Sequence, residues 1–416
     1  MRLLVVTQYF WPEGFRINDL VAELVRRGHE VTVLTGLPNY PDGAVFPAYR
    51  ANPRNFSGFS GANVVRVPML PRGQGGVWLI LNYLSFAVSA SLFGPLNLRG
   101  RPFDAIFVYE PSPITVGIPA IVMRWLKKAP IAFWVLDLWP QSLEAVGAVK
   151  SPIVLKLVSR LVGFIYNNCD LILAQSRSFV PQIASYLDDD QRVVYFPSWA
   201  EVIDPPEHAL PAPEVPASPD SFDIVFAGNV GEAQDFPTLL DAAKLLVDAP
   251  VRWLVVGDGR KADWVRSEII RRNLENKVIM LGRYPIERMP SFFNQADALL
   301  VSLKSDPIFA LTIPAKLQTY LAAGLPILAA LDGVGADVVH ASGAGFAVAA
   351  GDAAGLARAI RRLMALDPTE RQEMGRRGRR YAEAEFDRGR LISRMEAWLR
   401  DLVARQGNTP GGRGVS

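Results

Sequence analysis

Residues 298–330 read ALLVSLKSDPIFALTIPAKLQTYLAAGLPILAA, and this stretch decides the fold. The apolar run 298–303 predicts a buried parallel strand, and a polar loop follows it. A helical pattern of apolar residues then starts at Pro314, and Gly324 ends it. Residues 327–330 begin the next strand. The unit is therefore strand–loop–helix–strand, and its helix opens at the carboxyl end of a strand, where open α/β sheets bind their ligands.

Lys316 falls in the first turn of this predicted helix. The helix macrodipole already places partial positive charge there, so a cation costs about 0.3–1 kcal/mol unless an anion neutralises it. Free backbone N–H groups of a first helical turn, together with one ammonium group, make a phosphate site. The alternative is an ordinary lysine that extends into water.

Size and composition limit the possible classes of protein. Half of the 416 residues are apolar, and a chain of this length favours two domains over one. The single cysteine, Cys169, argues against a disulfide-linked scaffold. A formal charge of +3 is too small to imply nucleic acid, and we expect no such partner. Three scattered histidines and one cysteine give no metal-ligand spacing, so we predict no metal and no other cofactor.

Predicted strands and helices alternate through both halves of the chain, which is typical of doubly wound parallel sheets. Six prolines between residues 205 and 219 interrupt this alternation. We therefore expect two Rossmann-like α/β domains at 1–204 and 221–388, joined by a semi-rigid linker at 205–220. A terminal helix at about 389–405 should pack back on the first domain, and the Gly-rich residues 406–416 should be disordered. The predicted strands are 2–7, 30–35, 63–67, 105–109, 131–136 and 171–174 in the first half, and 224–227, 252–256, 278–281, 298–303, 327–330 and 343–348 in the second.

Residues 77–96 form an uncharged segment that is about as long as a membrane-spanning helix. Three interpretations stay open: an interfacial helix, a buried core helix and a true span. Nearby arginines favour the interfacial one, because they would face anionic lipid. These arginines are Arg66, Arg72, Arg99 and Arg101. The apolar start at residues 1–7 is too short for a signal peptide, so we expect a cytoplasmic protein held at the inner membrane.

Turn-rich segments follow most of the predicted strands and should gather at one edge of each sheet. In the first half they contain Gly14, Glu110 and the DLWP segment, in which Asp137 and Trp139 should project into the same cleft. Asp137 could also serve only as a helix cap or turn former. In the second half they contain the segments GNVG (228–231), GDG (257–259) and GRY (282–284). A lone GxG is a weak signal, but its place between a strand and a helix strengthens it.

Seven segments of the chain, in order, carry a further signal: QYFWPEGF, GHEVTVLTGLPNYPDG, LNYLSFAVSASL, DLWPQSLEAVGAV, FAGNVGEAQDF, VVGDGR and IPAKLQTYLAAGLPILA. Together they resemble the retaining GT-B glycosyltransferases of family 4, in particular the subgroup that builds bacterial O-antigen and capsule. The similarity is to N-acetyl-L-fucosaminyl transferases that act on polyprenyl-linked acceptors. It covers most of the chain up to about Phe386, and no single segment is specific.

The resemblance implies a nucleotide-sugar donor, with UDP as the first expectation, held mostly by the second domain, and a lipid-linked acceptor on the first-domain side. Transfer would retain the anomeric configuration without a metal, because the leaving phosphate can accept the acceptor's proton. The implied catalytic residues are Lys316, Asp137 and Asp306. The implied donor-binding residues are Gly14, Gly228, Asn229, Gly231, Gly257, Gly259, Arg283, Tyr284, Pro314, Gln318 and Thr319. Glu110 and Trp139 would lie on the acceptor side.

The chain departs from the family pattern at the donor site. Many family 4 enzymes carry two glutamates separated by seven residues, and Leu311 and Thr319 stand at these positions here. The usual Arg and Lys of the phosphate site are also missing, with Asn229 and Gln234 in the nearest positions. Gln318 or Thr319 would then replace the glutamate that contacts the ribose.

Three other functions are alternatives to a glycosyltransferase. A nucleotide-sugar epimerase shares the GT-B layout, but it needs paired acid and base residues in the cleft and has no need of a membrane-length helix. The missing glutamates favour a non-catalytic scaffold of a glycan-assembly complex. A nicotinamide dehydrogenase fits less well, because no GxGxxG segment with a downstream acid follows the first strand.

Overall fold

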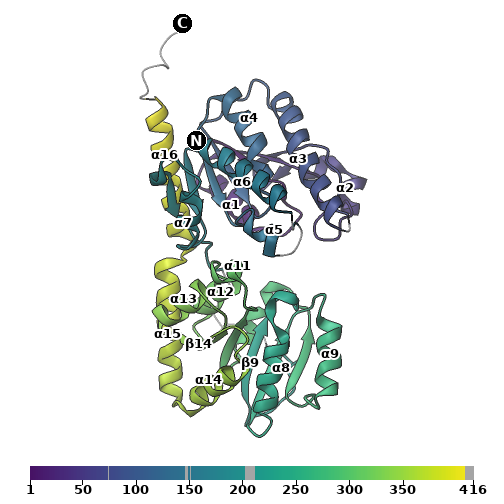
Figure 1. The fold of residues 1–416 in the computed structure, drawn as a ribbon, viewed down its shortest axis with the longest axis vertical. Coiled ribbons are helices and arrows are strands. Elements are labelled where there is room, and N and C mark those ends of the chain that lie inside the picture. Colours follow the sequence, from purple (N-terminus) through teal and green to yellow (C-terminus); the bar gives the residue numbers. More distant parts are fainter. Residues whose placement is uncertain (74, 146–148, 150, 202–210, 408–416) are drawn as a thin grey trace. The chain divides into compact units, whose positions relative to one another are not determined.

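The computed structural model describes residues 1–73, 75–145, 149, 151–201 and 211–407. The chain divides into two compact units (Figure 1). The first takes Met1–Phe196 and the C-terminal part from Arg390 onward, and the second takes Pro197–Gly389. Each unit has its own sheet covered by helices, which confirms the prediction of two Rossmann-like α/β domains.

The sheet of the first unit has the strand order β3-β4-β2-β1-β5-β6-β7-β8. Among the described strands of this sheet, β3 and β4 are antiparallel and the other neighbouring pairs are parallel. The strands are β1 (Arg2–Val6), β2 (Glu30–Thr35), β3 (Gly58–Phe59), β4 (Ala62–Arg66), β5 (Ala105–Glu110), β6 (Ile131–Val135), β7 (Leu171–Ala174) and β8 (Val193–Tyr195). The central strands β5 and β6 are buried along their whole length, because helices cover both faces of a parallel sheet.

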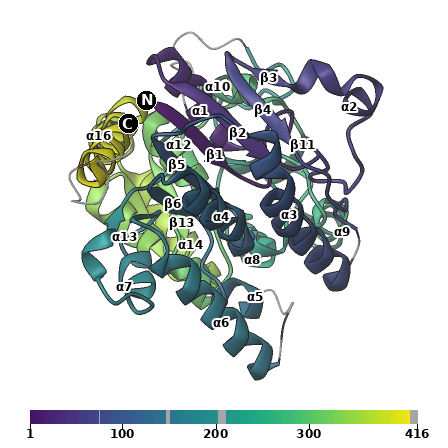
Figure 2. The ribbon, with the colours of Figure 1, turned by 90° about the horizontal axis from the view of Figure 1, so that it is seen from above.

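The direction of the crossovers decides which helices share a face of this sheet. The step from β1 to β2 runs one way along the sheet, whereas the steps from β4 to β5, β6 and β7 run the other way. Since parallel crossovers are right-handed, α1 covers one face and α3, α4 and α6 cover the other. Helix α4 contacts both α3 and α6 (Figure 2). The helices of this unit are α1 (Arg16–Arg26), α2 (Pro47–Ala51), α3 (Gly76–Asn97), α4 (Gly117–Lys127), α5 (Gln141–Ala145), α6 (Pro152–Asn167), α7 (Phe179–Ala184) and α16 (Arg388–Gly407).

The sheet of the second unit is parallel throughout, in the order β11-β10-β9-β12-β13-β14. Its strands are β9 (Phe222–Ala227), β10 (Val251–Val256), β11 (Val278–Gly282), β12 (Ala298–Ser302), β13 (Ile327–Ala330) and β14 (Gly345–Val348). Its helices are α8 (Phe236–Leu245), α9 (Ala262–Arg271), α10 (Met289–Phe293), α11 (Pro307–Ala310), α12 (Ala315–Ala323), α13 (Val334–Ser342), α14 (Ala353–Ala365) and α15 (Pro368–Glu385). The strand order reverses between β9 and β12, so a ligand site is expected at their carboxyl ends.

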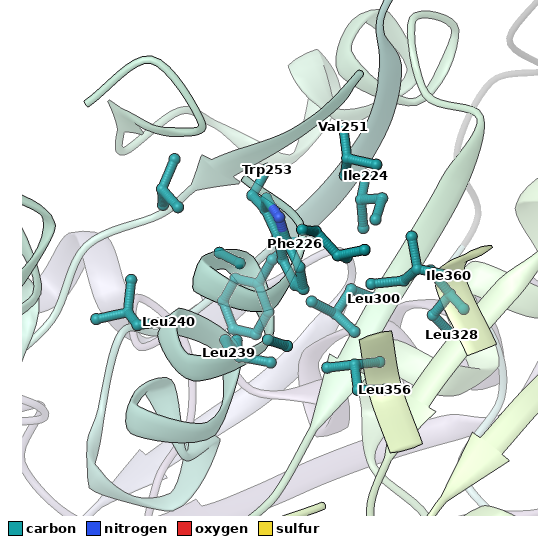
Figure 3. Packing of buried hydrophobic residues seen from close by; sticks show 14 of the residues in the cluster. Ile224, Phe226, Leu239, Leu240, Val251, Trp253, Leu300, Leu328, Leu356 and Ile360 are labelled. Atoms are coloured by element: carbon teal, nitrogen blue, oxygen red, sulfur yellow. The ribbon is translucent and has the colours of Figure 1, made fainter. Parts of the chain in front are cut away.

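One core of the second unit lies between the sheet and the helices α8 and α14. Phe226 and Trp253 come from neighbouring strands, and they pack with Leu239 of α8 and Leu356 of α14 (Figure 3). These four side chains are at most 4% exposed. Close packing in this core fixes Phe226, the next-to-last residue of β9, beside the candidate site.

Some predicted boundaries differ from the structure. Residues 211–216 were expected in an extended linker, but Ala212 and Val215 are buried in the core of the second unit and Glu214 pairs with Arg288 at 3.0 Å. The linker prediction is therefore wrong for these residues. Burial of the two apolar side chains in the core stabilises this segment more than an extended, solvated conformation would. Residues 202–210 and the predicted tail 408–416 lie outside the described residues. The short strands β3 and β8 were not predicted.

Helix α16 joins the first unit through a charged and an aromatic contact. Glu396 lies 2.6 Å from the ring nitrogen Nε2 of His29 and 2.5 Å from Arg27, and it is 6% exposed. The rings of Trp398 and Phe196 meet at 6.0 Å. The C-terminal end of the chain thus packs beside the start of β2 and the end of α1.

Candidate functional site

Helix α12 is fixed against the end of β9 by a buried tyrosine. The hydroxyl of Tyr320 accepts a hydrogen bond from the Ala227 amide at 2.8 Å and donates to the Ala227 carbonyl at 3.1 Å. Pro314 is the residue before the first helical turn, and its fixed φ suits that position. The first turn of α12 is therefore held beside the loop that follows β9.

Lys316 extends from this turn toward that loop. Its Nζ atom lies 3.8 Å from the centre of the Phe226 ring, and a Cβ atom on Gly228 would lie 3.2 Å from it. Nζ is buried and has no hydrogen-bond partner among the described residues, although the rest of the side chain is only half-buried. Burial lowers the pKa of Lys316 to about 7. A buried cation without a partner is costly, so the site is electrostatically incomplete without an anion.

The glycine loops allow two strand ends to approach each other closely. The Gly228 amide donates to the Val256 carbonyl at 2.8 Å, and a Cβ atom on Gly257 would overlap the carbonyl oxygen of Gly228. Both glycines have a positive φ, +134° and +157°. A Cβ atom on Gly259 would meet Asn229 at 2.5 Å. These positions therefore require glycine, and the absence of a side chain at Gly228 leaves room for the Lys316 ammonium beside the backbone.

Two neutral amides stand where the family resemblance leads one to expect Arg and Lys. The side chain of Gln234 accepts from the Gly231 amide at 3.1 Å and from the Asn229 amide group at 3.4 Å. These groups shape the loop by bonding one another. The Lys316 ammonium lies beside Gly228.

The third strand end lies next to the GDG loop. The Gly257 amide donates to the Gly282 carbonyl at 2.7 Å, which brings Arg283 and Tyr284 to the same edge of the sheet. Arg283 is exposed, and the Tyr284 ring packs against Phe292 at 4.9 Å. The structure thus gathers the GNVG, GDG and GRY segments, as the sequence predicts.

Three other predicted site residues bond to groups within the second unit. Asp306 accepts from the Ile308 amide at 3.0 Å and caps the short helix α11. Gln318 donates to the Ser198 carbonyl at 2.8 Å, and its Oε1 atom is buried without a partner among the described residues. The hydroxyl of Thr319 lies 3.5 Å from a carbonyl one turn earlier in α12. Since Gln318 and Thr319 are at most 8% exposed, both face the interior of the unit.

The first unit holds two neighbouring carboxyl groups at the ends of β5 and β6, of which Glu110 is fully buried and Asp137 is partly buried. The Asp137 amide lies 3.4 Å from the Glu110 carboxyl group, and Glu110 is fully buried. Burial, reinforced by the nearby charge of Asp137, raises the pKa of Glu110 well above its usual value. Burial also raises the pKa of Asp137, whose Oδ2 accepts from the Trp139 indole at 3.1 Å. Burial and the neighbouring carboxylate therefore both favour the protonated form of Glu110.

Sequence reasoning missed other residues around this pair. Tyr83 of α3 lies with its ring 6.0 Å from that of Trp139, and Ser112 forms a hydrogen bond with its hydroxyl. Asn82 accepts from Gln8 at 2.7 Å and donates to the Leu70 carbonyl at 2.6 Å. The adjacent polar residues Asn82 and Tyr83 in the middle of a mostly apolar helix were the signal that could have revealed them.

Hydrogen bonds to the neighbouring residue Glu13 fix the conformation of the Gly14 loop. Glu13 is buried, and its carboxyl group accepts from the amides of Phe10, Asn39 and Tyr40 at 3.1, 2.8 and 2.7 Å. Gly14 itself is exposed, and a Cβ atom there would meet nothing within 4 Å. Glu13 was not predicted as a site residue. Within the part of the chain that the structure describes, no group of three or more His, Cys, Asp or Glu residues could hold a metal ion.

Two family models match the chain in succession. Residues 14–199 match the model described as a glycosyl transferase 4-like domain, and residues 221–365 match that of the glycosyl transferases group 1. Together they span most of the chain. This protein belongs to the glycosyltransferases.

Two bacterial proteins named as glycosyltransferases are similar to this chain, and one of them is named for colanic acid biosynthesis. A protein named as the glycosyltransferase WbjE of Pseudomonas aeruginosa is 28% identical over 56% of this chain and 60% of its own length. The protein named as the colanic acid biosynthesis glycosyl transferase WcaI of Escherichia coli is 28% identical over 78% of this chain and 82% of its own. The chain thus spans less than two thirds of WbjE and most of WcaI.

Solved structures confirm the GT-B fold. Sucrose-phosphate synthase from Thermosynechococcus elongatus superimposes with a TM-score of 0.70 at 16% identity, over 97% of this chain and 99% of that one. Anabaena HepE in complex with UDP and glucose gives 0.65 at 15% identity, over 96% of this chain and 99% of that one. WaaG, a glycosyltransferase of lipopolysaccharide biosynthesis, gives 0.63 at 13% identity, over 97% of this chain and 99% of that one.

Proposed function

We propose that this glycosyltransferase moves an N-acetylated deoxyhexose from a UDP-linked donor to a polyprenyl-diphosphate-linked saccharide, with retention, during the synthesis of a bacterial surface polysaccharide. The observation that carries the proposal is the buried, unpartnered ammonium of Lys316 beside Gly228. HepE has been solved with UDP, and WcaI is named for colanic acid biosynthesis. Both support a UDP-sugar and a glycan acceptor here.

The donor's diphosphate matches what the second unit lacks. Lys316 supplies a positive charge, the first turn of α12 supplies backbone N–H groups, and the Gly228 and Gly257 loops allow close backbone approach. Negative charge grows on the diphosphate as the sugar leaves, so these groups stabilise the transition state more than the ground state. Without a ligand, about half of the Lys316 side chains are neutral near pH 7. The diphosphate stabilises the protonated form.

Retention needs no protein nucleophile in a front-face reaction. The acceptor oxygen attacks the anomeric carbon from the side of the leaving group, and the departing phosphate oxygen takes its proton. Asp137 is then left to orient acceptor hydroxyls, and Glu110, whose pKa burial raises, holds the Asp137 backbone from behind. We assign this role to Asp137 in preference to Asp306, whose carboxylate already caps α11.

Helix α3 supports a place for the enzyme at the cytoplasmic face of the inner membrane, where a lipid-linked acceptor is held. It is long and apolar enough to cross a bilayer by length and composition, and a third of its most apolar window is buried. The strands β4 and β5 that flank it belong to one sheet. A true span would separate these strands, so the proposal is that α3 lies at the membrane surface.

A specific observation favours an epimerase as the second candidate. The Glu110–Asp137 pair supplies the paired acid and base groups that such an enzyme needs. An epimerase converts the nucleotide-sugar without an acceptor. Its product is therefore a changed UDP-sugar, and its activity is indifferent to lipid.

The test measures UDP release with a UDP-N-acetyl-deoxyhexose donor, with and without a polyprenyl-diphosphate-linked saccharide. We expect release that depends on the acceptor, disappears in Lys316→Ala and persists in Lys244→Ala. Lys244 is exposed on α8, so its replacement by alanine makes the same chemical change away from the site. NMR of the product should show the donor's anomeric configuration. Acceptor-independent conversion of the donor would instead establish the epimerase, and an inverted product would overturn retention.

A further inference from the structure

Three neighbouring helices of the first unit expose large apolar side chains. On α3, Val77 and Leu92 are 72% and 61% exposed. Trp125 at the end of α4 is 63% exposed, and Leu157 and Phe164 of α6 are 57% and 50% exposed. All three helices cover the same face of the sheet. The outward surface of such a helical layer is normally polar, so these side chains form an unusual apolar surface.

The inner side of each helix already provides the packing that the fold needs. On α3, Asn82, Phe86 and Ala90 are buried against the sheet, one helical turn apart. Val162 and Ile165 do the same on α6. The exposed apolar residues therefore add nothing to the core of this unit.

Charge distinguishes this surface further. Neither Asp nor Glu occurs in residues 76–103, 111–136 or 151–169. Exposed cations stand along the three helices and the turns that follow them: Arg99, Arg101, Lys128, Lys156 and Arg160. Within the described part of the chain, none of these five side chains forms an ion pair. The surface is apolar and positively charged at once.

We propose that the combined α3–α4–α6 surface docks on a bilayer that contains anionic phospholipid. Apolar side chains enter the headgroup region, Trp125 takes the interfacial position that tryptophan prefers, and the cations meet lipid phosphates. A second copy of this chain fits less well, because a symmetric dimer would set one basic surface against another. The proposal deepens the proposed function and rests on it, since the acceptor's lipid lies in the same leaflet. It goes beyond α3 by assigning α4 and α6 to the membrane.

The same geometry connects the lipid to the carboxyl pair. Tyr83 lies on the inner side of α3, beside Trp139 and near Asp137. Leu84, the next residue along α3, is 47% exposed on its outer side. Helix α3 therefore forms the wall between the bilayer and the residues proposed to orient the acceptor.

The test is sedimentation of the full-length protein with phosphatidylcholine vesicles that contain or lack phosphatidylglycerol. The first variant, Leu157→Ser with Phe164→Ser, changes α6 alone, and its exposed positions leave the fold intact. The second, Lys156→Gln with Arg160→Gln, removes two cations, each of which contributes about a fivefold gain in affinity for anionic lipid. The matched control is Val247→Ser with Ile270→Ser, which removes equally exposed apolar groups (58% and 63%) from the second unit.

We expect the wild type and the control to bind vesicles with phosphatidylglycerol. The apolar variant should lose binding, and the charge variant should bind about 25-fold more weakly. Unchanged binding by the apolar variant would overturn the role of α6. A wild-type dimer in size-exclusion chromatography that this variant converts to a monomer would assign the surface to a second copy. Isothermal titration with UDP keeps the two proposals apart: UDP binding without vesicle binding overturns only the docking, and the reverse overturns only the transferase site.

Discussion

Replacing Lys316 by methionine should make the empty protein more stable while it destroys donor binding. Burial lowers the Lys316 pKa from 10.5 to about 7, which corresponds to ~5 kcal/mol of cost for the charged form. The contact with the Phe226 ring returns ~2 kcal/mol. Methionine fills similar space and packs well against an aromatic ring. The second unit should therefore gain ~3 kcal/mol at pH 6, or about 6–12 °C in its melting temperature.

The gain should depend on pH in a defined direction. Below about pH 7 Lys316 is protonated in both the folded and the unfolded states, so the folded protein bears the full cost. Between about pH 7 and pH 10.4 only the unfolded chain holds the proton, and the stability of the wild type rises with pH. The advantage of Lys316→Met should thus shrink by about 1.4 kcal/mol per pH unit above 7.

Thermal unfolding at pH 6 and pH 9 measures this effect, and isothermal titration with UDP measures binding. We expect affinity for UDP to fall about 100-fold in Lys316→Met, because a charge-assisted contact to phosphate is lost. Lys244→Met is the matched control, with no change expected in either assay. If Lys316→Met melted earlier at pH 6, or bound UDP as the wild type does, the view of Lys316 as a buried cation awaiting a diphosphate would be refuted.

The remaining predictions concern the other parts of both sites. In the wild type, the raised pKa of Glu110 makes the free energy of unfolding fall as the pH rises above the pKa of this group in the unfolded chain. Glu110→Gln should remove this fall, and chemical denaturation between pH 5 and pH 8 measures it. Gly257→Ala should destabilise the second unit by about 3 kcal/mol, because a Cβ atom would overlap the Gly228 carbonyl. Gly14→Ala should leave the stability unchanged and raise the KM for the donor. A thermal-shift screen should show UDP stabilising by ~2.7 kcal/mol at 100 times its Kd and GDP by much less; equal shifts would contradict the choice of nucleotide.

Local sequence patterns were enough to predict the architecture. Apolar runs of strand length, helical periodicity and glycines between them are properties of neighbouring residues, and they gave two parallel sheets with the GNVG and GDG segments at strand ends. The approach of these loops also follows from the sequence, because only glycine fits where a backbone crosses a carbonyl. The uncharged segment 77–96 was likewise visible as one long helix.

Other properties depend on residues that are far apart in the chain. Twenty-seven positions separate Glu110 from Asp137, and only the pairing of β5 with β6 makes one raise the pKa of the other. The sequence places Lys316 in a first helical turn, but the loop after β9 and the Phe226 ring bury its ammonium.

Tertiary structure also decides which face of a helix or loop is used. It directs the Asp306 carboxylate to cap α11 and turns Gln318 toward Ser198. It also exposes apolar residues of α6 to solvent. Periodicity in the sequence shows that a helix has two different faces, but not which of them is buried. Periodicity is a local property, but burial and charge depend on what the whole fold brings to each side chain.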